Sequence, residues 1–406
     1  MQKIQRPIIF FLIFATMFVL GGIQNTKGIV LEQIQKDIQI DISQIGLMVT
    51  VFQIGFLLAS LVAGILADRR GVKVVMIVGA VMMIVGLFGT SVAFDVLFFL
   101  GFYLVVGLGI GTMTVSVATL IPTYFRERSG VVFNVANAFF GIGMVVTPLI
   151  LNAMFAQNVS WRTFYVGGAV VVVVILLALT AFRQDAGVEK NPEDAVTLLS
   201  VVRLFADRQV LLVVLFILFY VATEAGFLNF FPILYSSLEL DGVSAADKVA
   251  TAGFVVSSFA LLFTIGRFAG GLIIYKLGER RTLLYFSIFA LLSLIVGRIF
   301  LENATYIFIV FGLAMSVLFP TAQGVGAKLT TKSGSLQGLI YVASGLGGAA
   351  VGVAIGEVSA LVGIEDGFNL LIVFAALFCV CALLIRVPST DADSQAALGP
   401  KVRGRH

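Results

Sequence analysis

The sequence predicts an all-α membrane protein whose twelve transmembrane helices form two pseudo-symmetric six-helix bundles. Three observations predict this fold class. Hydrophobic residues make up 60% of the 406 residues and charged residues only 12%, whereas soluble proteins carry roughly 25% charged residues. Twelve apolar runs have about the 20 residues that a spanning helix needs. Short motifs of the first half recur in the second half at a nearly constant spacing, which is typical of an internal repeat.

The twelve apolar runs are separated by short polar loops, with one longer exception. We expect spanning helices at residues 8–31, 42–67, 73–94, 97–121, 130–154, 162–182, 209–236, 249–275, 281–301, 304–327, 334–361 and 366–386. The longer interruption is rich in charged residues and divides the chain into six helices plus six. The predicted organisation is therefore an N-terminal bundle (1–182), a cytoplasmic linker (183–208), a C-terminal bundle (209–388) and a disordered cytoplasmic tail (389–406).

The positions of the cations predict the orientation in the membrane, because Lys and Arg accumulate in cytoplasmic loops. With this helix order, only four of the 26 Lys and Arg face the side opposite the N-terminus, and two more, Lys27 and Arg267, lie inside helices. The other twenty share the side of the N-terminus. The sequence therefore predicts a multi-pass protein of the cell membrane, an inner membrane in a bacterium, with both termini in the cytoplasm.

The two halves repeat a short charged loop and a glycine pair. The loop Gly64 to Lys73 aligns with Gly271 to Arg280 at a spacing of 207 residues, which places Gly71 on Gly278. The pair in Gly141-Ile142-Gly143 aligns with Gly345-Leu346-Gly347, and Ser129 with Ser333, at a spacing of 204. Matches at one near-constant spacing indicate two parallel six-helix repeats.

The first copy of the loop resembles the signature of the Major Facilitator Superfamily, G-x-L-A-D-R-x-G-x-K, at Gly64, Leu66, Ala67, Asp68, Arg69, Gly71 and Lys73. The resemblance implies that Asp68 lies near the start of the helix expected from about Ser333 and helps to hold the halves together while the inner side is closed. Gly64, Asp68, Arg69, Gly71 and Lys73 are thus the candidate gating residues. Because Tyr275 stands where the first copy has Asp68, we expect a one-sided latch.

Three further stretches are similar to the fucose–proton symporter group of sugar permeases. They are Ile265-Gly266-Arg267-Phe268, Phe319-Pro320-Thr321, and Asn134-Val135-Ala136-Asn137 with Gly143. This resemblance implies a sugar as the substrate. The carboxylates that the group uses for proton coupling fall at or near Gly28 and Thr112, so the resemblance does not carry that mechanism to this chain.

Three charged residues lie well inside predicted helices, where ionisable groups are costly and usually functional. Glu224 is a candidate for binding substrate or a proton, and the alternative is a structural ion pair. Arg267 stays protonated, so it binds a substrate oxygen or belongs to the inner gate. Lys27 attracts an anion or extends to the outer interface. With about 1.5 Å of rise per residue, Glu224 lies roughly 10 Å deeper than Lys27, and Arg267 roughly 9 Å deeper again, which predicts a ladder of charges along one cavity.

Uncharged amides are the other candidate binding groups. Asn134 and Asn137 are three residues apart and share a helix face. The others are Asn25, Asn229, Gln24, Gln53 and Gln323. Amides suit sugar hydroxyls, but polar side chains also hold membrane helices together, and both roles stay open for each residue.

The function predicted from these features is secondary active transport by alternating access. The expected substrate is a small polar solute, most of all a sugar, with protons as a candidate coupling ion. A small organic anion and proton-coupled efflux of drugs or metabolites are the alternatives. We expect a monomer in the lipid bilayer with no nucleic-acid partner. We expect no enzyme activity, cofactor or metal site, because the sequence has no nucleotide motif, metal constellation or nucleophile–base pair. A receptor on the same fold fits less well, since no large soluble domain is present to signal.

Overall fold

The chain is helical throughout the part that the computed structural model describes, which is residues 2–24, 30, 33–34, 37–38, 42–182, 203–302, 305–330 and 332–386. The first half contains α1 (Gln2–Gln24), α3 (Ile42–Arg70), α4 (Val72–Ser91), α5 (Val96–Phe125), the 3₁₀ turn η1 (Arg126–Arg128), α6 (Ser129–Ala156) and α7 (Trp161–Ala181). The second half contains η2 (Arg203–Ala206), α9 (Arg208–Ser237), α10 (Ala245–Leu277), α11 (Glu279–Ile299), α12 (Ile307–Ser316), α13 (Leu318–Leu329), α14 (Ser333–Val362) and α15 (Ile364–Leu384).

Eleven apolar stretches of the described chain are long enough to cross a membrane. One of them, Val96–Ala156, contains the two helices α5 and α6 with η1 between them. Counted by helix, each of the twelve predicted spans is matched by helix in the described residues, and most of the ends lie within four residues of the prediction. Residues 25–29 and 31 of the first predicted span lie outside the described residues. The predicted tail and residues 183–202 of the predicted linker lie outside the described residues.

The tenth predicted span differs from the prediction because it is broken into α12 and α13 at Val317. Pro320 accounts for the break. Proline has no N–H, and its ring clashes with the carbonyl four residues earlier, which here belongs to Ser316, the last residue of α12. In the sequence, Pro320 belongs to a motif shared with the sugar permeases, and the apolar run around it predicts one unbroken helix.

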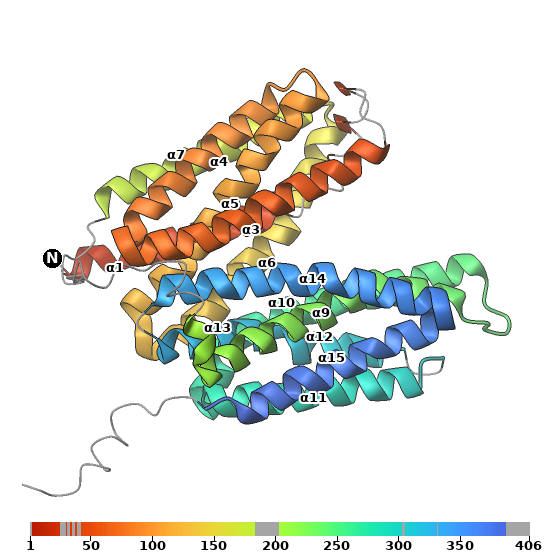
Figure 1. Cartoon of the computed structure of the whole chain (residues 1–406). Helices are drawn as coiled ribbons and strands as arrows, with labels where there is room; N and C mark the ends of the chain where they lie inside the picture. The colour runs from red at the N-terminus through yellow and green to blue at the C-terminus, as the bar shows by residue number, and fades with distance from the viewer. Residues whose placement is uncertain are drawn as a thin grey trace, which may run out of the picture.

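The two halves form separate bundles that repeat one packing scheme (Figure 1). In the first bundle α1 packs on α6, and in the second α9 packs on α14. A Cβ added at Gly143 of α6 would lie 2.0 Å from the carbonyl oxygen of Phe18, and one at Gly347 of α14 would lie 2.3 Å from that of Leu218. The glycines that the repeat aligns therefore make the same close helix contact in both bundles.

The aligned loops also share their backbone geometry. Gly71 joins α3 to α4 with a φ of 88°, and Gly278 joins α10 to α11 with a φ of 77°. Only glycine adopts this region without strain. Each glycine donates its N–H to the carbonyl four residues earlier, Ala67 and Ile274 respectively. The repeat predicted from the sequence is thus present at the level of individual turns.

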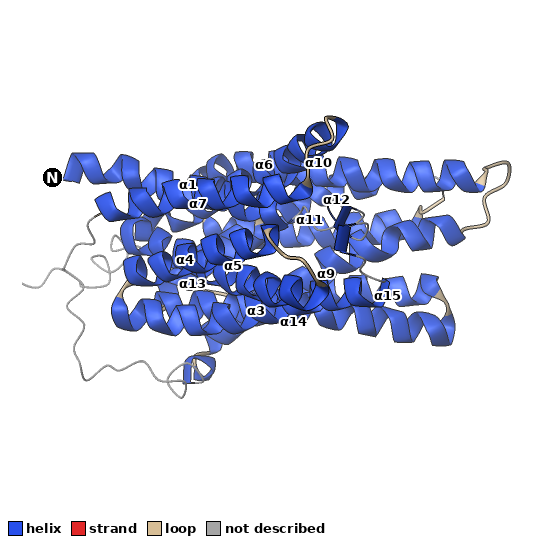
Figure 2. Ribbon diagram, turned by 90° about the horizontal axis from the view of Figure 1, so that it is seen from above, coloured by secondary structure: helices blue, strands red, loops and turns tan. Residues whose placement is uncertain are grey.

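The bundles meet at one end of the molecule, called here the Asp68 end, and separate towards the other (Figure 1). Along α14, Gly338, Gly345, Gly352 and Gly356 lie on one face by helical spacing. Added Cβ atoms at the first two would meet Ser60 and Leu57 of α3 within 2.7 Å, whereas those at the last two would meet nothing within 4 Å. The gap therefore opens beyond Gly345, along helices that lie roughly parallel (Figure 2).

Candidate functional site

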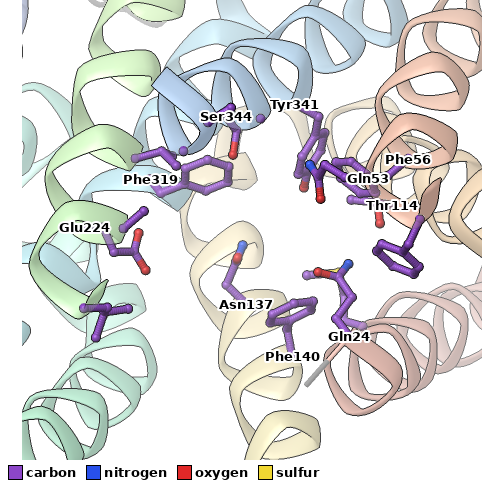
Figure 3. Close-up of a pocket in the computed structure, with 18 of the residues that line it drawn as sticks. Gln24, Gln53, Phe56, Thr114, Asn137, Phe140, Glu224, Phe319, Tyr341 and Ser344 are labelled. Atoms are coloured by element: carbon purple, nitrogen blue, oxygen red, sulfur yellow. The ribbon is translucent and has the colours of Figure 1, made fainter. Parts of the chain in front are cut away.

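A cavity of about 540 Å³ lies between the two bundles, at the point where they begin to separate. Its walls come from both halves: α1, α3, α5 and α6 on one side, and α9, α10, α13 and α14 on the other. Figure 3 shows Glu224 facing Gln24, Asn137 and Thr114 across the open space. A solute in this cavity would contact both bundles at once.

Glu224 of α9 and Arg267 of α10 are the only charged side chains that line the cavity in the described part of the chain. Arg267 is 8% exposed, and its Nε atom has no hydrogen-bond partner. Its guanidinium carbon lies 4.2 Å from the centre of the Phe263 ring, a cation–π contact. Glu224 interacts electrostatically with Arg267 and with Tyr220. An incompletely satisfied cation therefore lies at the cavity wall beside one carboxylate.

Amide and hydroxyl groups line the facing walls. Of the predicted amides, Gln24, Gln53 and Asn137 line the cavity, on α1, α3 and α6. The Nδ2 of Asn137 donates to the Phe133 carbonyl at 2.9 Å. Sites that bind polar solutes combine a few such groups with aromatic walls.

Three other predicted amides do not line the cavity. Gln323 is fully buried behind it and donates to the Tyr341 hydroxyl at 3.0 Å, so it positions a wall residue. Asn134 lies between the bundles, where it donates to the Gly130 carbonyl at 2.9 Å and to Thr321 Oγ1 at 3.5 Å. Asn229 is exposed on α9. The remaining candidates, Lys27 and Asn25, lie outside the described residues, so the upper end of the predicted charge ladder does too.

Sequence reasoning missed several residues of the cavity wall. Thr114, Tyr341 and Ser344 add hydroxyls, and Phe52, Phe56, Phe140 and Phe319 add aromatic rings. With 37 Phe in the chain, a single ring carries no signal. Tyr341 had a weak one, because it follows Gln337 by four residues on the face that also carries Gly345.

Asp68 lies at the start of α14, as the family resemblance implies. Its Oδ1 accepts from the Gly334 N–H at 2.9 Å and its Oδ2 from the Ser335 N–H at 2.6 Å. The first N–H groups of a helix have no partner within the helix, and its positive dipole end attracts a carboxylate. The close approach requires glycine, since a Cβ at Gly64 would lie 2.4 Å from the Gly334 carbonyl oxygen.

The other residues of the charged loop have different contacts. Gly71 forms the turn described above. The Lys73 ammonium donates to the Phe182 carbonyl at the end of α7, which ties the loop to its own bundle. Arg69 is exposed beside Asp68. Gly64 and Asp68 contact the other bundle directly.

The sequence predicts a one-sided latch, and the structure adds a second acid close to the equivalent helix start. Tyr275, the counterpart of Asp68, is 83% exposed. However, Glu279, one residue beyond the Gly278 turn, lies against the start of α6, because a Cβ added at Gly130 would lie 2.7 Å from its Oε1. This acid lies four residues beyond Tyr275, on the other side of the Gly278 turn, so the repeat spacing does not align it with Asp68.

Known proteins resemble this chain along most of its length. A nitrite extrusion protein of Bacillus subtilis (strain 168) is 29% identical over 332 residues, 78% of this chain and 78% of that protein. The multidrug resistance protein MdtL of Salmonella paratyphi C (strain RKS4594) is 28% identical over 251 residues, 59% of this chain and 61% of its own.

Two solved structures share the fold. The transporter FucP in its outward conformation superposes with a TM-score of 0.79 at 19% identity, covering 93% of this chain and 98% of FucP. The proton:xylose symporter XylE superposes with a TM-score of 0.70 at 12% identity, covering 95% of this chain and 97% of XylE. The sequence model of the Major Facilitator Superfamily matches residues 10–353. With its two six-helix bundles and the signature loop at their junction, this chain belongs to the Major Facilitator Superfamily.

Proposed function

We propose that the protein is a secondary active transporter that carries a small polar solute by alternating access of the cavity between its bundles. The observation that carries this proposal is the shape of that cavity. Its walls come from both bundles, it is closed at the Asp68 end by contacts between α3 and α14, and the bundles separate at the opposite end. Rocking one bundle against the other would open the cavity to the opposite side.

The orientation follows from the cation bias of the sequence. The Asp68 end carries Arg69, Arg70, Arg126 and Lys328, in keeping with the cytoplasmic side of a membrane. In that orientation the cavity is open to the exterior. The proposed state is therefore outward-facing, which agrees with the superposition on FucP in its outward conformation.

A sugar or similar polyol is the leading solute. Gln24, Gln53 and Asn137 offer amides, Tyr341 and Ser344 offer hydroxyls, and phenylalanine rings cover the remaining wall. An amide side chain can donate a hydrogen bond to a sugar hydroxyl and can also accept one from it. The volume lies within the roughly 300–1,000 Å³ of small-molecule sites. The structural neighbours FucP and XylE are described as sugar symporters.

A small organic anion is the second candidate, and Arg267 is the observation that favours it. Its nearly buried guanidinium has an Nε without a hydrogen-bond partner, and a buried donor left without a partner costs free energy. A carboxylate on the solute would supply a bidentate partner. The nitrite extrusion protein among the relatives also handles an anion, according to its description.

Glu224 is the proposed proton site. It lines the cavity next to Arg267, so it can pair with that cation or hold a proton. No nucleotide motif is present in the sequence, so the proposed energy source is an ion or solute gradient. Glu224→Gln should then abolish uptake driven by a pH gradient and leave solute exchange between the two sides in place.

Uptake into proteoliposomes tests the function. Labelled neutral sugars, sugar acids and small carboxylates would be offered with and without an imposed pH gradient. Saturable uptake that is lost in Arg267→Ala supports the proposal, and its restriction to acids would select the second candidate. Asn229→Ala is the matched control, because Asn229 is exposed outside the cavity. Efflux of lipophilic cations, as the names of the multidrug relatives suggest, with no uptake of any of these solutes, would contradict it.

A further inference from the structure

The loops that face each other at the Asp68 end carry their acids on opposite sides of equivalent turns. Asp68 lies three residues before Gly71, at the end of α3. Glu279 lies one residue after Gly278, at the start of α11. Both glycines have positive φ and connect helices at the same end of the molecule. An acid on either side of such a turn lies at that end, so the two acids can serve equivalent contacts.

The helix starts that receive these acids are equivalent in the repeat. Asp68 of the first bundle meets the start of α14 in the second, and Glu279 of the second bundle meets the start of α6 in the first. Ser129 and Ser333, the first residues of the two helices, are the pair aligned at a spacing of 204. Both helix starts offer the unpaired N–H groups and positive dipole end that favour a carboxylate.

Lys328 extends the Glu279 contact across the junction between the bundles. Its ammonium nitrogen lies 2.9 Å from Glu279 Oε1 within the second bundle, and it donates to the carbonyl of Glu127 in the first bundle at 3.2 Å. The side chains of Lys328 and Glu279 are 15% and 6% exposed. The pair is thus shielded from solvent while the bundles touch.

Two more polar contacts cross the same junction. Arg126 Nη2 donates to the Lys328 carbonyl at 3.5 Å, and Ser129 Oγ donates to the Gly324 carbonyl at 3.3 Å. The backbones also touch there, because a Cβ at Gly324 would lie 2.6 Å from the Cα of Gly130. In each of these hydrogen bonds the donor lies in one bundle and the acceptor in the other. Each of them would therefore break when the Asp68 end opens.

We propose that Glu279 and Lys328 form a second clasp that holds the Asp68 end closed. We call it the Glu279 clasp: Glu279 and Lys328 of the second bundle against the Glu127 carbonyl and the Gly130 backbone of the first. This inference rests on the proposed alternating access. The Glu279–Lys328 pair itself stays within the second bundle, and only its contacts with α6 and η1 form and break during the cycle.

The test measures the distance between the bundles and needs no substrate. Spin labels would be placed at exposed positions of the Asp68 end, through Thr123→Cys and Lys276→Cys, after Cys379 and Cys381 are replaced by Ala. We expect Glu279→Gln and Lys328→Met each to lower the ratio of closed to open molecules at least roughly five-fold, the lower range of coupling between conformational states. The double variant should lower this ratio only slightly more than either single variant, because the two residues share one contact.

Glu127→Gln is the matched control. It removes an acid at the same junction but keeps the carbonyl that Lys328 contacts, so its distances should match the unmodified labelled protein. Monodisperse elution of every variant shows that it is folded. Wild-type distances in both Glu279→Gln and Lys328→Met, with a shift in Asp68→Asn, would overturn the clasp. Wild-type distances in Asp68→Asn as well would contradict the alternating access on which the clasp rests.

Discussion

The two junctions of the Asp68 end join the same pair of bundles by different chemistry. At the first, α3 and α14 touch backbone to backbone, and both oxygens of Asp68 accept N–H groups of the opposite helix. At the second, Glu279 faces α6 less directly: its Oε1 pairs with Lys328, and its Oε2 has no hydrogen-bond partner. Backbones touch at both junctions, so the difference lies in the acids: the contact of Asp68 is rigid and sensitive to shape, and that of Glu279 is adjustable and sensitive to charge.

The largest expected effect is steric and concerns the first junction. Gly64→Ala places a methyl group 2.4 Å from the Gly334 carbonyl oxygen, a backbone atom that cannot move alone. Overpacking of this kind costs about 1–3 kcal/mol, so we expect closed molecules to decrease by roughly ten-fold or more at the upper end. The spin-label distances described above provide the measurement.

The control for this prediction lies on α14. A Cβ at Gly352 would meet nothing within 4 Å, so Gly352→Ala should leave the closed state as it is. Equal distance distributions in Gly64→Ala and Gly352→Ala would show that the first junction is not shape-sensitive.

The next effect comes from charge at the first junction. Asp68→Asn keeps one acceptor oxygen but loses the charge that faces the start of α14, and a carboxylate at a helix start contributes about 0.3–2 kcal/mol. We expect solute binding to survive while the turnover of transport decreases several-fold. Binding measured by calorimetry beside initial uptake rates separates the two, and a parallel loss of both would contradict a pure gating role.

A smaller effect is expected from the same steric change at the second junction. Gly130→Ala brings a methyl group 2.7 Å from Glu279 Oε1, which is the end of a side chain rather than backbone. The carboxylate can shift, so the expected loss of closed molecules is only a few-fold, about 1 kcal/mol. If Gly130→Ala opens the Asp68 end as strongly as Gly64→Ala, the second junction is as rigid as the first.

The smallest effect belongs to the residue that the repeat aligns with Asp68. Tyr275 is 83% exposed, and exposed substitutions away from such contacts change stability by roughly 0.5 kcal/mol or less. Tyr275→Phe should therefore transport at the wild-type rate. A marked defect would place the second clasp at Tyr275 instead of Glu279.

Much of the fold was predictable because membrane-spanning helices can be recognised in a sequence by their length and hydropathy. The helix boundaries, the repeat and the position of Asp68 depend on local patterns: an apolar run, a glycine at positive φ, a motif that ends a helix. Pro320 shows the limit, since four helices of the chain contain a proline and remain unbroken. Whether a proline breaks a helix depends on the packing around it.

The cavity was predictable only in part, because apolar residues cover every side of these helices. Periodicity then cannot distinguish a face towards lipid from a face towards the other bundle. Charged residues were found because they are rare, as Glu224 and Arg267 show. Asn134 and Gln323 were assigned to the site but lie behind or beside it, and Tyr341 was overlooked. An acid on the other side of the equivalent turn, as at Glu279, is not aligned with its counterpart by the repeat spacing.

Access to a single cysteine in the cavity tests the central claim most directly. Ser344 lines the cavity on α14, and Ser344→Cys in a Cys379→Ala, Cys381→Ala background would be labelled with a membrane-impermeant thiol reagent from each side of the membrane. The account predicts that Ser344→Cys is labelled from the side opposite the Asp68 end. In Asp68→Asn, labelling from the Asp68 end should increase and labelling from the opposite side should decrease. Equal labelling from both sides in every variant, or from neither, would contradict alternating access to this cavity.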